Sequence, residues 1–300
     1  MRRVDGDHVA VECQILSALL PAGLAFLMFS VGLKLTLADF RVVFGSPKAL
    51  LTGLAVQMLF LPVAAILLAL TFGLSPLMAT GLVILSVSPG GITSNYIAML
   101  ARADVALSAA MTMITSLAAA ISVPAALSAA GAVLIMQSPA RSGLGGIALA
   151  MTLVSVLPLL GGMVFVRFLP GLAGRFGGVL DGLSKAVFAA IVISTFVENW
   201  GVMTQYASEA GLACILLNLA AIGMAFAASA AMKLSSAQAM AISVEAGMQN
   251  AAISMFVAAS LFGDPALAIP ALLYALAMNF TAMALIALRN SRLSSLSRSA

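Results

Sequence analysis

Long apolar runs without charged residues constrain the fold of this chain more than any other feature. Seven such runs occupy residues 13–33, 49–72, 74–101, 105–136, 143–166, 210–232 and 265–288. A membrane-spanning helix needs about 20 apolar residues, so each run is long enough to cross a bilayer. Two further runs, 183–203 and 234–263, contain charged residues but have comparable lengths. The sequence therefore predicts an all-α polytopic membrane protein with about nine transmembrane helices.

The composition excludes most other classes of protein. Only 8% of the residues are charged, whereas soluble domains carry about 25%. The 14 basic residues are scattered over short loops and form no basic face, so we expect no nucleic-acid partner. No nucleophile–base pair and no metal-ligand spacing indicates an enzyme. The sequence gives no sign of an obligatory protein partner. We expect the chain to be embedded in a lipid bilayer.

The positions of lysine and arginine predict the orientation in the membrane. These residues collect in cytoplasmic loops, and nine spans with an outside N-terminus place 11 of the 14 basic residues inside. The three on the outside are Arg2, Arg3 and Arg141. We therefore expect a multi-pass protein of a bacterial-type inner (plasma) membrane, with its C-terminus in the cytoplasm.

Two spans carry helix-breaking residues at their centres. Pro89-Gly90-Gly91 interrupts the third span, and Glu245-Ala246-Gly247 precedes a second interruption in the eighth. Since the two spans are five apart, they cross the membrane in opposite directions, as in transporters with inverted repeats. We predict a single transporter domain over residues 1–300. Its repeats cover approximately 13–136 and 183–288, and a connector helix covers 143–166.

Glu245 indicates a cation or proton site. A carboxylate at the bilayer centre costs on the order of 2.5 to 3.5 kcal/mol even on a lenient insertion scale. Gln249 lies one helical turn further on and Asn250 follows it, and such oxygens suit a hard cation such as sodium. Further polar side chains are predicted at the same depth: Gln57, Ser94, Asn95, Ser108 and Thr112. Ser108 and Thr112 are four residues apart, so they should share one face of the fourth span.

The broken third span predicts a second kind of site. The half-helix that follows the break has free amides around Ile92, Thr93 and Ser94, and its positive dipole end points into the bundle. Broken helices of this kind bind anionic substrate groups in other transporters. We therefore expect an organic anion as the second ligand.

These motifs closely resemble the bile acid:sodium symporter family. The resemblance rests on Pro89-Gly90-Gly91 with Ser94-Asn95, on Asp104 to Ser108 with Thr112, and on Glu245-x-Gly247-Met248-Gln249-Asn250. It runs over roughly residues 15 to 290. It implies core and panel domains, and two coupling sodium ions beside the crossing of spans three and eight. Some bacterial relatives have ten helices, and the nine-span form resembles the animal members.

The resemblance also implies a ligand set. By position, Ser94, Asn95, Ser108, Thr112 and Glu245 would form one sodium site. Gln57, Glu245 and Gln249, with the backbone carbonyls of Ala246 and Met248, would form the other. The organic anion would lie next to the crossing, near Thr93, Asn250 and Asn279.

The sequence thus predicts a sodium-coupled symporter of an organic anion, such as a bile-acid-like compound or a small carboxylate, that works by alternating access. Two alternatives stay open. One is a proton-coupled or uncoupled exporter of the same superfamily, and the other is a membrane receptor that binds a ligand without transporting it.

Overall fold

The computed structural model describes residues 20–35, 45–91, 93–134, 143–198 and 200–299. Every regular element in these ranges is a helix. The first covers Leu20–Gly32. It is followed by α3 (Pro47–Ala55), η1 (Val56–Phe60), α4 (Leu61–Phe72), α5 (Pro76–Ser86), α6 (Ser94–Leu100), α7 (Val105–Gly131), α8 (Gly143–Met151), η2 (Thr152–Val156) and α9 (Leu157–Phe168). The second half contains α10 (Pro170–Glu198), α11 (Trp200–Ala231), α12 (Ser236–Gly247), α13 (Ala251–Phe256), η3 (Val257–Phe262), η4 (Pro265–Ala268) and α14 (Ile269–Ser299).

The apolar helices confirm a multi-pass membrane protein. Within the described ranges, five helices are long and apolar enough to cross a membrane: Pro47–Phe72, Val105–Gly131, Gly143–Phe168, Met203–Ala231 and Ala266–Ser291. Shorter apolar helices cover Leu20–Gly32, Pro76–Ser86 and Ala251–Phe262. The number of nine spans stays a prediction. The polar lead before residue 13, Arg2, Arg3 and Arg141 lie outside the described residues.

Two of the long helices contain a π-helical turn just before a proline. η1 precedes Pro62, and η2 precedes Pro158. A proline inside a helix cannot donate to the carbonyl four residues earlier, and its ring clashes with that carbonyl. The helix widens to relieve this clash, and such π turns are common at functional sites. In the second predicted span, the wider turn carries Gln57.

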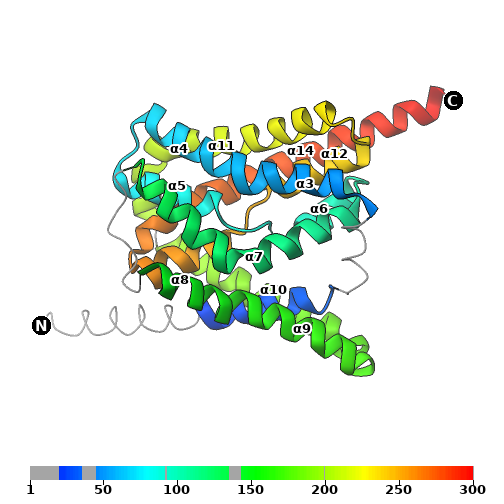
Figure 1. The fold of residues 1–300 in the computed structure, drawn as a ribbon, viewed down its shortest axis with the longest axis horizontal. Helices are drawn as coiled ribbons and strands as arrows, with labels where there is room; N and C mark the ends of the chain where they lie inside the picture. Colours follow the sequence, from blue (N-terminus) through cyan, green and yellow to red (C-terminus); the bar gives the residue numbers. More distant parts are fainter. Residues whose placement is uncertain (1–19, 36–44, 92, 135–142, 199, 300) are drawn as a thin grey trace, which may run out of the picture.

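The helices pack into two groups (Figure 1). In one group, α11 packs against α4, α12 and α14, while α7 packs against α3, α6 and α12. In the other, α9 packs against α10, and Phe29 of the first helix packs edge-on against Phe165 of α9. Asp181 of α10 forms ion pairs with Lys34, just beyond the first helix (2.7 Å), and with Lys185 of the same helix (2.8 Å). The groups meet mainly where α7 packs along α8 and η2.

Candidate functional site

The chain leaves the helical conformation at both predicted interruptions. α5 ends at Ser86 and α6 begins at Ser94, while α12 ends at Gly247 and α13 begins at Ala251. Pro89 has no N–H to continue a helix. Asn250 starts α13, because its side-chain oxygen accepts a hydrogen bond from the Ile253 amide at 3.2 Å. Such capping favours a helix start at this residue.

The two interrupted segments lie against each other and run in opposite directions. Gly90 and Gln249 form an isolated antiparallel bridge. The Gly91 amide donates to the Met248 carbonyl at 2.6 Å, and the Asn250 amide donates to the Pro89 carbonyl at 3.0 Å. Backbone groups freed by the two breaks thus satisfy one another inside the bundle, as membrane depth requires. We call residues 89–91 and 248–250 the crossing.

Two glycines at the centre of the crossing leave little room for a side chain. A Cβ atom on Gly90 would collide with Oε1 of Glu245 and lie 3.3 Å from Nε2 of Gln57. A Cβ atom on Gly91 would lie 3.0 Å from the Met248 carbonyl oxygen. The two glycines therefore let the backbone approach both a side-chain carboxylate and a second backbone segment.

Glu245 is the one charged side chain that is fully buried in the part of the chain that the structure describes. The Ser108 hydroxyl donates to its Oε2 at 2.8 Å, and the Thr112 hydroxyl donates to its Oε1 at 2.6 Å. Ser94 lies beside them, with its hydroxyl 3.5 Å from that of Thr112. The four residues come from α6, α7 and α12. The prediction that Ser108 and Thr112 share one face of a helix is confirmed.

Several amide side chains around the crossing carry buried oxygens without a hydrogen-bond partner. They are Oε1 of Gln57, Oδ1 of Asn95 and Oε1 of Gln249. An unpartnered buried polar group costs about 1–3 kcal/mol. Carboxylate, hydroxyl and amide oxygens are the ligands that hard cations take in proteins. The residues at the crossing therefore fit a sodium ion, which would supply the missing partner.

One expected detail of this ligand set differs in the structure. Gln249 lies in the extended segment after the end of α12, so it does not sit one helical turn above Glu245. Its side-chain nitrogen donates to the Ala246 carbonyl at 2.9 Å. The Met248 carbonyl accepts the bond from Gly91. Each carbonyl oxygen keeps a second lone pair with which it can contact an ion.

The three predicted substrate residues are in different surroundings. Thr93 precedes α6 and is exposed, and Asn279 is exposed on α14 with its side-chain nitrogen donating to the Ala275 carbonyl at 2.6 Å. Asn250 is buried, and its Nδ2 has no hydrogen-bond partner. Of the three, only Asn250 is part of the crossing.

The sequence analysis missed two residues that hold the second break in place. Asn218 of α11 and Tyr274 of α14 both donate to the Gly247 carbonyl, at 2.7 and 2.9 Å. Both side chains are fully buried. A polar Asn218 in an otherwise apolar span was the available signal. Tyr274 gave none, because its partner is far away in the sequence.

The fold and this site define a polytopic membrane protein with an oxygen-lined carboxylate at the crossing of two broken helices, an arrangement that transporters use to bind ions. The chain belongs to the Sodium Bile acid symporter family, because the sequence model of that family matches residues 21–206.

Curated relatives agree with this membership. The chain is 26% identical over 83% of its length to a probable sodium/metabolite cotransporter, BASS1, of Oryza sativa, and 28% identical over 83% to BASS1 of Arabidopsis thaliana. It is 25% identical over 86% of its length to YocS of Bacillus subtilis, an uncharacterized sodium-dependent transporter of which it covers 78%. The chain spans about three-fifths of the length of the two plant relatives, 60% and 61%.

Proposed function

We propose that this chain is a sodium-coupled symporter of an organic anion. The observation that carries the proposal is the buried Glu245 carboxylate. Two hydroxyls orient it, at 2.8 and 2.6 Å, and unpartnered amide oxygens surround the crossing beside it. A buried carboxylate needs a compensating charge, and sodium supplies one. Membership of a sodium symporter family supports the same ion.

Two ions share Glu245 in this proposal. Ser94, Asn95, Ser108 and Thr112 would complete the first site, from the side of α6 and α7. Gln57, Gln249 and the carbonyls of Ala246 and Met248 would complete the second, from the side of η1 and the crossing. Because both sites use residues of the two breaks, ion binding would order the crossing.

The organic anion would bind beside the ordered crossing. Nδ2 of Asn250 is a buried donor without a partner, and it suits a carboxylate oxygen. Thr93 and Asn279 are exposed and would meet the rest of the anion from α6 and α14. Sodium and anion binding would then be linked reciprocally, since each stabilises the arrangement that the other needs.

Transport would follow from movement between the two helix groups. The group of α3 to α7 with α11 to α14 would be the core, and the first helix with α8 to α10 would be the panel. In this proposal the two halves are inverted repeats, the N-terminus is outside and the C-terminus is in the cytoplasm. Alternating access by the core against the panel would expose the crossing to each side in turn.

Thermal stability in sodium against potassium tests the proposal. The purified full-length chain is heated at equal ionic strength in the two salts, together with Glu245→Gln and the matched control Asp181→Asn, whose carboxylate lies in the other helix group. Sodium at about 100 times its dissociation constant should stabilise the wild-type chain by roughly 2.7 kcal/mol. The control should keep this gain and Glu245→Gln should lose it.

Equal wild-type stability in both salts would contradict sodium coupling. A stability that then follows pH would favour the proton-coupled exporter. A sodium response without flux of any organic anion into proteoliposomes would favour the receptor.

A further inference from the structure

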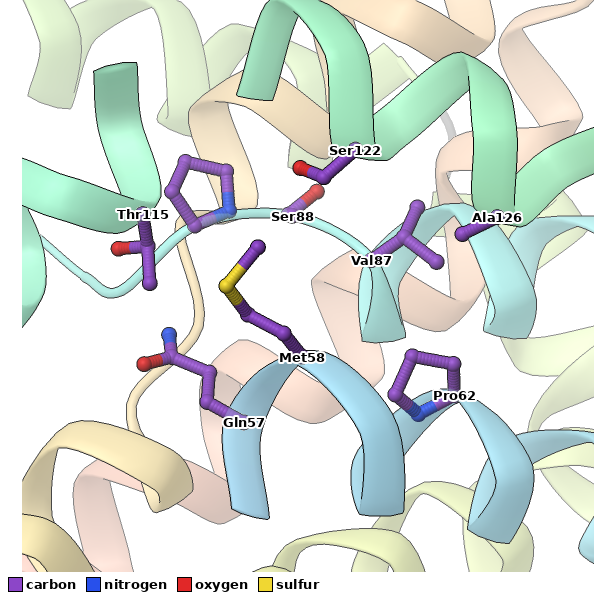
Figure 2. A pocket seen from close by; sticks show the side chains of 9 residues that line it. Gln57, Met58, Pro62, Val87, Ser88, Thr115, Ser122 and Ala126 are labelled. Atoms are coloured by element: carbon purple, nitrogen blue, oxygen red, sulfur yellow. The ribbon is translucent and has the colours of Figure 1, made fainter. Parts of the chain in front are cut away.

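A small cavity lies next to the crossing. It has a volume of about 20 Å³ and is lined by Gln57, Met58, Ser88, Thr115, Ser122 and Ala126, among others. A cavity needs a volume of about 10–15 Å³ to hold one water molecule. The cavity therefore has room for a single water molecule, and hydroxyl and amide groups face it (Figure 2).

The cavity borders Gln57, a side chain of the candidate ion site that lacks hydrogen-bond partners. Both polar atoms of the Gln57 side chain are buried and lack a hydrogen-bond partner. Ser88 donates to the Ile84 carbonyl at 2.9 Å and Thr115 donates to the Met111 carbonyl at 2.9 Å. Their oxygens still have lone pairs for a further donor. A water molecule in the cavity would thus find several partners, and Gln57 would gain one.

The backbone of the crossing borders both the cavity, through Pro89, and Glu245, through Gly90. The Gly90 amide donates to the Thr115 hydroxyl, which lines the cavity, at 3.3 Å. On its other side Gly90 touches the Glu245 carboxylate, and Gln57 Nε2 lies close to the same point. No charged side chain lines the cavity. A cation would thus find no charged partner in the cavity itself, and the nearest carboxylate is that of Glu245.

The lining residues place the cavity in one half of the membrane. Pro62 lies in the first turn of α4 and Ala126 lies near the end of α7. Both residues lie toward Phe72 and Gly131, the helix ends that the loop charges predict to be outside. Met58 reaches across the cavity between Gln57 and Ser88 (Figure 2). Its unbranched thioether side chain can change rotamer at little cost.

We propose that this cavity is an outer access chamber in which sodium exchanges its hydration water for protein oxygens on the way to Gln57 and Glu245. A water molecule occupies the chamber at rest, and Met58 moves when the ion passes. This inference rests on the proposed sodium-coupled function and adds the route by which the ion arrives.

Cysteine accessibility tests the chamber. In a background with Cys13 and Cys214 replaced by alanine, Ser122→Cys is placed in the full-length chain in right-side-out membrane vesicles. A small cationic methanethiosulfonate is added from outside in sodium or in potassium. Val133→Cys is the matched control, because this residue is 60% exposed just beyond the end of α7 and does not line the cavity.

The cavity at rest admits only one water molecule, but Ser122 is only half-buried and the proposed chamber opens when Met58 moves. The chamber therefore predicts that Ser122→Cys reacts from outside and that sodium protects it. With sodium at about ten times its dissociation constant, roughly a tenth of the sites stay empty, so modification should slow about tenfold. Val133→Cys should react equally in both salts. No reaction of Ser122→Cys, reaction only from the cytoplasmic side, or equal rates in the two salts would overturn the chamber.

The thermal stabilities of the wild-type chain and of Ser122→Cys distinguish a failure of the chamber from a failure of the proposed sodium coupling. If the wild-type chain shows no sodium-specific stabilisation, sodium coupling itself fails. If sodium stabilises both the wild-type chain and Ser122→Cys, then a Ser122→Cys variant that sodium does not protect refutes the chamber but not sodium coupling. Should Ser122→Cys lose the sodium response, Ala126→Cys, on the same wall of the cavity, is used in its place.

Discussion

Replacing Gly90 by alanine introduces a methyl group into the centre of the candidate ion site. The new Cβ atom would collide with Oε1 of Glu245 and lie 2.8 Å from its Cδ. Gln57 Nε2, at 3.3 Å, closes the space on another side. The carboxylate therefore has to turn away, and doing so breaks its 2.6 Å hydrogen bond from Thr112.

The structure suggests the size of this effect. Overpacking a tight interior typically costs about 1–3 kcal/mol, and a hydrogen bond to a charged group contributes about 1.5–3 kcal/mol. Because the carboxylate is the end of a flexible side chain, part of the collision can be relieved by its movement. We expect Gly90→Ala to lower stability by about 1–3 kcal/mol, within the overpacking range, and to abolish the sodium response.

Thermal unfolding of the purified full-length chain in sodium and in potassium measures both effects. Gly145→Ala is the matched control, because its new methyl group would meet no atom within 4 Å. Gly145 lies in α8, where alanine is favoured over glycine by roughly 0.5–1 kcal/mol. A Gly90→Ala variant with wild-type stability and an intact sodium response would refute the placement of Glu245 against the crossing.

Two further variants separate the support of the site from surface interactions. Tyr274→Phe removes one of the two donors to the Gly247 carbonyl, so calorimetry should show a loss of about 0.5–1.5 kcal/mol and a weaker sodium response. Tyr96→Phe, at an exposed position, should change neither, and an unchanged Tyr274→Phe variant would argue against a positioning role. Asp181→Asn removes two half-exposed ion pairs, which should cost less than about 1 kcal/mol, and a larger loss would mean that these pairs hold the second helix group together.

Local patterns in the sequence predicted two features around Glu245. The four-residue spacing of Ser108 and Thr112 placed both hydroxyls on one face, and both contact Glu245. Pro89 with two glycines predicted the break between α5 and α6. In these cases the cause lies within a few residues, in helix periodicity or in a missing N–H, so the sequence alone is sufficient.

Features that depend on distant partners were not predicted. Gln249 was expected one helical turn above Glu245, but α12 ends at Gly247, and the backbone after it pairs with the other broken segment. Asn218 and Tyr274 act on a carbonyl 29 and 27 residues away. The π turn at Gln57 had a local signal in Pro62, which the apolar run around it concealed.

Equilibrium binding of radioactive sodium to the purified full-length chain tests the central claim most directly. We predict saturable binding of two ions per chain that unlabelled sodium displaces and potassium does not. Glu245→Gln should abolish this binding and Asp181→Asn should leave it unchanged, because only Glu245 lies at the crossing. A wild-type chain that binds no sodium, or a Glu245→Gln variant that binds as much as the wild type, would contradict the account.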